Sequence, residues 1–464
     1  MMRFFPVFVP ARIWTLLLSD ILLILGSFVL ASYFDLTLRA TDYLLYDGGL
    51  LNIALLPLPS ILIGLYLQDL YSDIYVKSRM VLLEQLFLAI GVALVLVSLA
   101  MYLNITPRMA IGVFGGGCGL SMVAIFFWRI IYTVWVLQKI GRDSVLLVGG
   151  NSVLLDVAKH IEEHPEMGLK VTGYVDDIHD AESELPGGKF LGPVASLRDI
   201  VAATRPSRIV VGMFERRNRV PVSELLEMRF SGHVIEEAAT AYERVCGRVC
   251  IKELRPSQLI YTGELGPRRQ TLRRQNLANM AIAVVILVPS LVLMALTALA
   301  VRLFSPGPIF YRQTRIGMDG VPFTLYKFRS MHQNAEAVTG AVWATRDDPR
   351  VTRVGRVLRK IRFDELPQLF NVLRGEMSIV GPRPERPEFV KALSEQIPYY
   401  RQRHCVRPGI TGWAQINYKY GDTVEDTIIK LEYDLFYIKN MRLSLDTYII
   451  FHTLKAMLAT GHGQ

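Results

Sequence analysis

The chain has 464 residues, a hydrophobic fraction of 51% and a formal net charge of +9 at pH 7. This length exceeds one ordinary domain and allows two or three, and the hydrophobic fraction is high for a soluble globular protein. The four cysteines and eight histidines form no ligand cluster in the sequence. Cys246 and Cys250 lack a second Cys or His pair nearby, which argues against a zinc site and favours reduced thiols.

The positive charge is concentrated in the C-terminal part of the chain. Residues 268–464 contain 28 Lys and Arg against 16 Asp and Glu, so the rest of the chain is slightly acidic. This excess indicates anionic partners such as phosphates, nucleotides or an anionic membrane surface. Nucleic acid would also satisfy the charge, but neighbouring membrane segments argue against it, and we expect no nucleic-acid partner.

Four apolar stretches open the sequence, each close to the ~20 residues that a membrane-spanning helix needs. They run over Ile13–Tyr33, Leu50–Leu67, Leu82–Leu103 and Met109–Val136. We expect a four-helix transmembrane bundle over residues 1–140. The first run is expected to be a span rather than a cleaved signal peptide, because three more spans follow it. The basic loop residues favour both ends of the bundle in the cytoplasm.

Residues 141–266 are predicted to form a Rossmann-like cytosolic domain. Apolar strands are expected at Ser144–Val148, Val171–Val175 and Arg208–Val211, alternating with helices at Val153–Ile161 and Val222–Arg229. This alternation is typical of a parallel α/β domain. The turn after the first strand holds only two glycines, at 149 and 150, without the third that a dinucleotide fingerprint requires. The pattern therefore favours a structural or regulatory module over a cofactor-binding one.

A fifth apolar run, Ala278–Leu303, has Pro289 near its centre, where proline removes a helix hydrogen bond and bends the chain. Positive charge flanks both of its ends, at Arg268, Arg269, Arg273, Arg274, Arg302, Arg312 and Arg315. Charge on both flanks does not suit a single crossing. We therefore favour a re-entrant helix–break–helix over residues 278–303, the alternative being a transmembrane helix with a proline kink.

The polar segment that follows carries the chemistry. Arg353, Arg356 and Arg359 recur at helical spacing, and Val354, Val357, Leu358 and Ile361 would form the apolar face of the same helix. A second helix is predicted to begin at about Asp364, because Pro367 is tolerated only in a first turn. As its N-cap, Asp364 would meet the positive end of the helix dipole and stay ionised, as a nucleophile or metal ligand must. The alternative is an ordinary cap beside a solvated or membrane-facing basic face.

The run FDELPQLFNVLRGEMSIVGPRP (Phe363–Pro384), together with SPGPIFYRQ, YKFRSM and RPGITGWAQ, resembles the polyprenyl-phosphate hexose-1-phosphate transferases. These are also called monotopic phosphoglycosyl transferases or bacterial sugar transferases. The resemblance covers Gln270 to about Lys455. The upstream part resembles the large subclass, in which four transmembrane helices and a Rossmann-like domain come first. It implies that residues 267–464 form an α/β-poor catalytic domain with a re-entrant helix and amphipathic interfacial helices.

The resemblance also implies roles for individual residues. Asp364 matches the nucleophile and Glu365 the second member of an Asp-Glu dyad, and both are linked to Mg²⁺. Arg359 matches a residue that holds phosphate, and Arg383 matches one associated with the nucleotide. Pro289 matches the proline that breaks the re-entrant helix. The expected phosphate or nucleotide set is completed by Lys327, Arg329 and Arg312, and the expected structural prolines by Pro382 and Pro384. Some small members have a serine before the proline; here Val288 stands there, which leaves Ser290 to bond the backbone.

The implied reaction moves a hexose-1-phosphate from a UDP-sugar to undecaprenyl phosphate through a covalent aspartyl-phosphosugar, with release of UMP. Glucose is expected as the sugar and galactose is the alternative, in the first membrane step of exopolysaccharide, O-antigen or capsule synthesis. The expected location is the bacterial inner membrane, among its lipids, with the catalytic domain at the cytoplasmic face; a homo-oligomer stays open. Two rivals are a membrane-anchored nucleotide-sugar dehydratase and a non-catalytic assembly scaffold. The dehydratase would need a Tyr-x-x-x-Lys motif, which the sequence lacks.

Overall fold

The structure is a computed structural model of the whole chain. It describes residues 11–34, 40–45, 48–68, 70–71, 79–103, 110–133, 143–177, 186–213, 221–254, 269–333, 348–418 and 423–460. These form two compact units, one built mainly from residues 8–236 and the other mainly from residues 237–464. The domain boundaries predicted at 140/141 and 266/267 lie outside the described residues.

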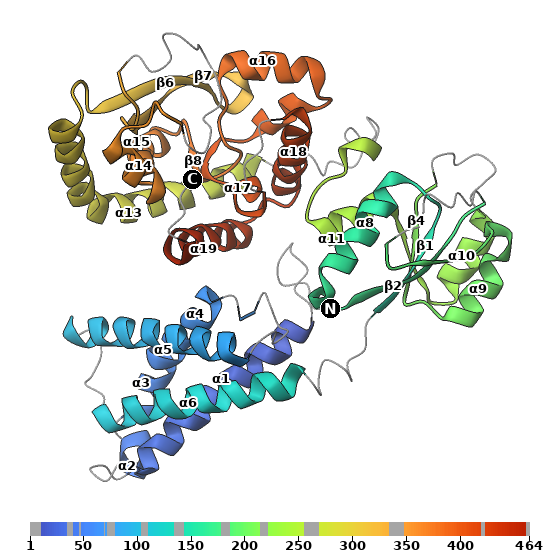
Figure 1. Cartoon of the computed structure of the whole chain (residues 1–464), viewed down its shortest axis with the longest axis horizontal. Coiled ribbons are helices and arrows are strands. Elements are labelled where there is room, and N and C mark those ends of the chain that lie inside the picture. The colour runs from blue at the N-terminus through green and yellow to red at the C-terminus, as the bar shows by residue number, and fades with distance from the viewer. Residues whose placement is uncertain are drawn as a thin grey trace. The chain divides into compact units, whose positions relative to one another are not determined.

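The first unit begins with apolar helices. They are α1 (Ala11–Phe34), α2 (Ala40–Leu45), α3 (Gly49–Leu55), α4 (Pro57–Leu67), α5 (Arg79–Tyr102) and α6 (Ile111–Ile131). Helix α1 packs along α6, and α4 packs along α5 (Figure 1). Four segments are long and apolar enough to cross a membrane, namely Ile13–Phe34, Gly49–Leu67, Leu82–Tyr102 and Ile111–Ile131. The prediction of membrane-length apolar helices in this part is confirmed.

The second of these segments is not one helix, as its apolar run had suggested. Helix α3 ends at Leu55 and α4 begins at Pro57, with Leu56 in a non-helical conformation between them. Proline has no backbone N–H to donate to the preceding turn, but its fixed φ suits the first position of a new helix. The break therefore follows from Pro57.

A buried ion pair joins α1 to α6. The Arg129 Nη2 atom lies 2.7 Å from Asp20 Oδ2, and Arg129 Nη1 donates to the Leu70 carbonyl at 2.7 Å. The Tyr71 hydroxyl also donates to Asp20 Oδ2, at 2.9 Å. Charges inside an apolar bundle are costly unless they are paired and hydrogen-bonded. This cluster therefore fixes how the two helices and the 70–71 segment pack together.

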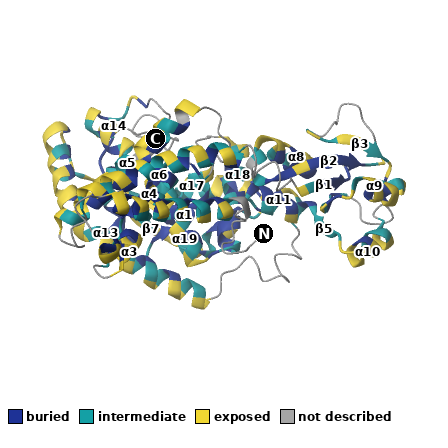
Figure 2. Cartoon of the chain, turned by 90° about the horizontal axis from the view of Figure 1, so that it is seen from below, coloured by how far each residue is buried: buried dark blue, intermediate teal, exposed yellow. Residues whose placement is uncertain are grey.

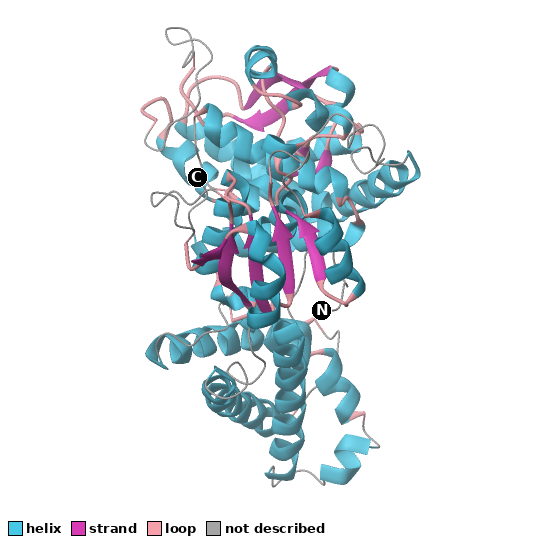
Figure 3. Ribbon diagram, turned by 90° about the vertical axis from the view of Figure 1, so that its right-hand side faces the viewer, coloured by secondary structure: helices cyan, strands magenta, loops and turns pink. Residues whose placement is uncertain are grey.

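A parallel sheet forms the rest of the first unit (Figure 3). Its strands are β1 (Asp143–Val148), β2 (Leu169–Val175), β3 (Lys189–Gly192), β4 (Arg208–Val211) and β5 (Val234–Glu237), in the order β3-β2-β1-β4-β5. The helices are α8 (Ser152–Glu163), α9 (Leu197–Thr204) and α10 (Val222–Phe230), with short turns η2 (Pro165–Met167) and η3 (Val194–Ser196). Strand β1 pairs in parallel with β2 and β4, and β2 with β3. Strands β1 and β2 are largely buried (Figure 2). The predicted parallel α/β domain is confirmed.

The glycine turn after β1 is explained by packing. Gly149 has a φ of +103°, and a Cβ atom there would lie 2.5 Å from the Gly212 carbonyl oxygen. A Cβ atom on Gly150 would lie 2.5 Å from Asp176 Oδ2. Gly149 therefore requires glycine, because both its φ and the backbone contact exclude a side chain, whereas at Gly150 the Asp176 side chain could move aside.

The second unit carries the remaining elements. They are α11 (Ala238–Cys246), η4 (Ile251–Glu253), α13 (Arg269–Phe304), β6 (Phe310–Ile316), η5 (Met318–Gly320), β7 (Pro322–Phe328), α14 (Arg353–Lys360), η6 (Phe363–Glu365), α15 (Gln368–Leu373), β8 (Ser378–Val380), α16 (Pro387–Gln396), η7 (Tyr400–Cys405), β9 (Gly409–Thr411), α17 (Trp413–Asn417), α18 (Val424–Lys439) and α19 (Leu443–Thr460). Strands β6 and β7 form an antiparallel hairpin, whereas β8 and β9 pair in parallel. The core gathers buried side chains of α15, α17, α18 and α19, including Val372, Trp413, Leu435 and Ile449.

Helix α13 is a fifth segment long and apolar enough to cross a membrane, and Pro289 lies inside it. The Ser290 hydroxyl donates to the Ile286 carbonyl at 2.7 Å, so this serine does bond the backbone next to the proline. A missing proline N–H and a serine bonded four residues back both favour bending, and the ribbon of α13 changes direction along its length in Figure 1. One face of α13 packs on the unit, while Val285 and Val292 on another are 72% and 66% exposed.

Candidate active site

Helix α14 packs closely against the segment after β7, at Gly355. The Thr352 side chain caps the helix by accepting from the Gly355 N–H at 2.9 Å. A Cβ atom on Gly355 would lie only 1.9 Å from the Ser330 carbonyl oxygen, so no other residue fits at this contact. The close approach lets Arg359 Nε donate to Ser330 Oγ at 2.9 Å.

The predicted helix at 353–360 is confirmed, but its apolar face is narrower than expected. Leu358 is buried, whereas Val357 is 60% exposed beside exposed Arg356. The reason is that α14 contacts the unit through the side that carries Val354, Gly355 and Leu358. The outward surface of α14 therefore mixes basic and apolar side chains.

The turn that carries the dyad differs from the prediction. No α-helix begins at Asp364: residues Phe363–Glu365 form the 3₁₀ turn η6, and α15 begins at Gln368. Arg362 precedes the turn in the left-handed conformation, with a φ of +57°. The i→i+3 bonds from Glu365 N to Arg362 O and from Leu366 N to Phe363 O tighten the chain here. Asp364 is therefore no N-cap, and the charges around it have to be judged from its neighbours.

Glu365 is held by cations on several sides. Its Oε1 atom lies 2.8 Å from Lys327 Nζ and 3.0 Å from Arg383 Nη2, and its Oε2 atom lies 3.9 Å from Arg362 Nη1. Burial alone would raise the pKa of Glu365, but Lys327, Arg383 and Arg362 outweigh it and hold the pKa well below its usual range. Glu365 is therefore a fixed anion that orients Lys327 and Arg383.

Asp364 is also buried, yet the described residues offer its carboxylate no hydrogen bond and no ion pair. Burial and the adjacent Glu365 raise the pKa of Asp364, against the opposing charges of Lys327, Arg359 and Arg383. A desolvated carboxylate with free oxygens is a better nucleophile than one whose lone pairs are occupied. Cations lie near both carboxylates of the dyad, but among the described residues they form ion pairs with Glu365 and not with Asp364.

The loop that carries Arg383 is fixed by hydrogen bonds to three consecutive backbone carbonyls. The Pro382 carbonyl accepts from the Gly409 N–H at 2.9 Å, and the Arg383 carbonyl accepts from Arg403 Nη2 at 3.1 Å. The Pro384 carbonyl accepts from Arg315 Nη1 at 2.9 Å. Since the prolines also restrict the backbone, Pro382 and Pro384 hold Arg383 so that its side chain reaches Glu365.

The structure does not bring every expected residue to the dyad. Arg312 stacks over the Tyr326 ring at 5.7 Å and, among the described residues, bonds to neither carboxylate. Arg329 is buried and donates from Nη2 to the Ser305 carbonyl after α13. Its Nε and Nη1 atoms are buried without a hydrogen-bond partner in the described part of the chain. Lys327, Asp364, Glu365 and Arg383 do come together, with Arg359 close enough to act on Asp364.

Sequence reasoning missed three arginines that support the site. Arg362 pairs with Glu365, and Arg315 and Arg403 bind the carbonyls that flank and carry Arg383. Arg362 could have been suspected because it is next to the dyad in sequence. Arg403 and Arg315 are 20 and 69 residues from their acceptors, and no local pattern marks such distant pairs.

The side chains of the dyad fit Mg²⁺ only in part. Among the described residues, no three His, Cys, Asp or Glu side chains converge on one point. Mg²⁺ commonly binds one or two carboxylates together with substrate phosphates and water, and the free oxygens of Asp364 fit that role. Glu365 does not fit as a ligand while Lys327 and Arg383 occupy its Oε1 atom.

Comparison with known proteins gives a family match for this region and relatives that match up to 71% of the chain. Residues 270–460 match the family described as bacterial sugar transferase. A UDP-N-acetylgalactosamine-undecaprenyl-phosphate N-acetylgalactosaminephosphotransferase of Aeromonas hydrophila is 47% identical over 48% of this chain and 51% of its own length. The match thus spans about half of that relative.

Two other relatives match over more of their length. A UDP-glucose:undecaprenyl-phosphate glucose-1-phosphate transferase of Xanthomonas campestris pv. campestris is 32% identical over 69% of this chain and 68% of its own length. A transferase of the same description from Klebsiella pneumoniae is 33% identical over 71% of this chain and 69% of its own. The chain therefore belongs to the bacterial sugar transferase family, the polyprenyl-phosphate hexose-1-phosphate transferases.

Proposed function

We propose that this protein transfers a hexose-1-phosphate from a UDP-sugar to undecaprenyl phosphate, with Asp364 as the nucleophile. One observation carries the proposal: Asp364 is a buried carboxylate without a bonding partner among the described residues, and its neighbour Glu365 binds Lys327 and Arg383. Phosphates match such a basic surround well. Relatives of this chain are named undecaprenyl-phosphate sugar-phosphate transferases.

In the first step, an Asp364 oxygen attacks the phosphorus that bears the sugar. A bond forms between that oxygen and the phosphorus, and the bond from the phosphorus to the bridging oxygen breaks. UMP leaves with the bridging oxygen and its electron pair. Asp364 then carries a phosphosugar as an acyl phosphate, and no proton has to move.

In the second step, an oxygen of the lipid phosphate attacks the same phosphorus. The bond to Asp364 breaks and the carboxylate is restored, which gives undecaprenyl-diphosphate-sugar. Splitting one transfer into two steps is typical of covalent catalysis and predicts ping-pong kinetics.

The other residues hold charge while the phosphoryl group moves. Lys327 and Arg383, oriented by Glu365, face the phosphoryl oxygens, and Arg359 acts from the Ser330 side. Of the described residues, Asp364 would hold Mg²⁺, which would supply further charge neutralisation at the phosphoryl group.

We further propose that α13 is re-entrant and that the catalytic unit lies at the cytoplasmic face of the inner membrane. The bend at Pro289, the Ser290 bond and the arginines before and after the helix support this topology. The mixed basic and apolar outer face of α14 suits an interfacial helix.

Cysteine accessibility tests the topology. Cysteines at positions 274 and 312, in a Cys405→Ser background, should be labelled by a membrane-impermeant maleimide from the same side. The other three cysteines are buried and serve as the background. Labelling from opposite faces would refute the re-entrant helix.

Glucose is proposed as the sugar, because two relatives that match 69% and 71% of this chain are glucose-1-phosphate transferases. N-acetylgalactosamine is the second candidate, because a relative named for that sugar is 47% identical over 48% of this chain. The purified protein should be incubated with UDP-glucose, UDP-galactose or UDP-N-acetylgalactosamine, without lipid, and its intact mass measured. The accepted sugar should add one sugar phosphate to the wild type and nothing to Asp364→Asn. An active enzyme without this added mass would refute the covalent route.

A further inference from the structure

A second pocket lies in the same unit, away from the dyad. It has a volume of about 120 Å³. Its lining comes from the first turns of α13, from Met318, from β8, from the chain before β9 and from the end of α18. It shares no lining residue with the Lys327, Asp364, Glu365 and Arg383 group. The pocket is therefore distinct from the proposed active site.

Two arginines, Arg273 on α13 and Arg407 before β9, line this pocket. The described residues offer neither of their side chains an ion-pair or hydrogen-bond partner. The carboxylate of Asp446 does not serve them, because its oxygens accept from Gln275 Nε2 at 2.7 Å and from the Tyr437 hydroxyl at 2.8 Å. The pocket therefore concentrates positive charge that the described protein does not neutralise.

A buried hydroxyl also lacks a partner here. Ser378 lines the pocket and is 7% exposed, and its Oγ atom is buried without a hydrogen bond in the described part of the chain. A buried polar atom without a partner is unfavourable, so native structures normally satisfy it with protein, water or a ligand. Ser378 and the two arginines could each donate to an oxygen-rich anion in the pocket.

We propose that this pocket binds a phosphate group, with Arg273 and Arg407 supplying charge and Ser378 Oγ a hydrogen bond. Guanidinium groups bind phosphate through paired N–H donors. The volume exceeds that of a single water site. Two sources offer this chemistry, a phosphate on a membrane lipid and the phosphate of a soluble nucleotide. The lipid is included because Arg273 lies in the first turns of α13, just before its apolar stretch.

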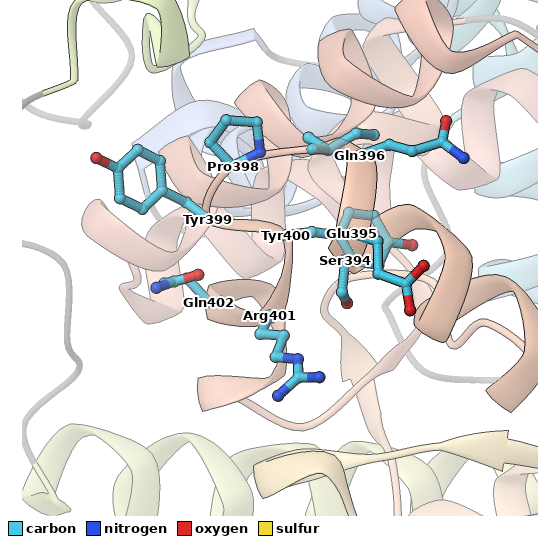
Figure 4. A pocket seen from close by; sticks show the side chains of 9 residues that line it. Ser394, Glu395, Gln396, Pro398, Tyr399, Tyr400, Arg401 and Gln402 are labelled. Carbon is cyan, nitrogen blue, oxygen red and sulfur yellow. The ribbon is translucent and has the colours of Figure 1, made fainter.

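The other pocket described for this unit differs from the proposed phosphate site, whose lining comes from several elements. It measures about 320 Å³ but is formed by one continuous segment, Ser394–Gln402. In Figure 4 the side chains of Tyr399, Arg401 and Gln396 point in different directions. Arg401 therefore offers a matched control, being an exposed arginine outside the proposed phosphate site.

Arginine modification tests the proposal without relying on activity. The full chain in nanodiscs of zwitterionic phosphatidylcholine is treated with phenylglyoxal, and the modification of Arg273, Arg407 and Arg401 is followed by mass spectrometry. One arm adds inorganic phosphate or UMP at constant ionic strength set with chloride. The other arm replaces part of the phosphatidylcholine with phosphatidic acid and adds no soluble phosphate.

Protection of Arg273 and Arg407, with Arg401 unprotected, supports the site, and the arm in which it occurs identifies the source. Arg407→Gln should weaken the protection of Arg273 roughly tenfold or more, the effect of losing a charge-assisted hydrogen bond. Ser378→Ala should weaken it less. Equal modification of all three arginines in both arms, or equal protection of Arg401, would overturn the proposal. Neither result depends on whether Asp364 is the nucleophile.

Discussion

Two buried glutamates of the C-terminal unit show how a structural cluster differs from a reactive one. Glu432 on α18 accepts from the Tyr242 hydroxyl at 2.8 Å and from the Ile251 N–H at 3.2 Å, with Arg248 Nη1 at 3.6 Å. These bonds join α18 to α11 and η4. Glu365 is equally well paired, but it stands next to Asp364, which the described residues leave without a partner.

The difference teaches that pairing alone does not mark function. At Glu432 the charge holds α18, α11 and η4 together, and among the described residues no second carboxylate shares its donors. At the dyad, Lys327 and Arg383 are bonded to Glu365, while the described residues leave the Asp364 carboxylate without a hydrogen bond or ion pair. Two adjacent buried carboxylates, one paired with cations and one without a partner among the described residues, therefore distinguish the proposed reactive cluster from the structural one.

The largest effect is expected from Asp364→Asn, which removes the free carboxylate. Because an amide cannot form the acyl phosphate, turnover should fall on the order of 10⁴-fold or more. UMP release from the UDP-sugar measures it. Asp319→Asn is the matched control, since Asp319 lies in the η5 turn at a φ of +57°, which asparagine tolerates. Near wild-type UMP release by Asp364→Asn would show that Asp364 is not the nucleophile and that the dyad does not differ in function from the Glu432 cluster.

Lys327→Met should have the next largest effect, because it removes the 2.8 Å partner of Glu365 and a cation at the dyad. Turnover should fall roughly 10²- to 10³-fold, as when one preorganised donor is removed. Lys391→Met, at an exposed position of α16, should not change it. If both variants turn over alike, Lys327 only supports the fold, as Arg248 does at Glu432.

Tyr242→Phe tests the structural cluster. The loss of its bond leaves a Glu432 oxygen poorly satisfied and should lower the free energy of unfolding by about 1–3 kcal/mol. Thermal unfolding in detergent measures this, and turnover of the folded protein should stay unchanged. Tyr399→Phe, whose hydroxyl reaches the Leu254 carbonyl only at 3.4 Å, should cost less. A loss of turnover without a loss of stability would reverse the roles assigned to the two clusters.

The smallest effect is a shift in pH dependence. Burial and Glu365 raise the pKa of Asp364 above its usual value, whereas the cations hold the pKa of Glu365 below its own. Attack requires ionised Asp364, so the burst of UMP should decline about tenfold per pH unit as the pH falls below that raised pKa. Rapid-quench measurements across acidic pH give the profile. A decline confined to the pH range in which an exposed aspartate titrates would show that burial does not raise the pKa of Asp364.

Local pattern predicted much of the molecule. The apolar runs, the strands at 144–148, 171–175 and 208–211 and the helix at 353–360 follow from hydrophobic period and length. The short elements β3, β5 and α9 were missed, because four to eight residues carry too little periodicity to stand out. Helix breaks at single residues were misjudged as well, at Leu56 and at the 3₁₀ turn of Asp364.

The sequence by itself determined the membrane-length runs, the order of the domains and the identity of the Asp364-Glu365 pair, since each depends on neighbouring residues. Only the tertiary structure decided which carboxylate is bound and which is free. That outcome depends on Lys327 and Arg383, which lie 38 and 18 residues from Glu365 and meet it through the β6–β7 hairpin and the fixed Pro-Arg-Pro loop. Charges buried together act over a few ångströms of space, and distance along the chain does not record that proximity.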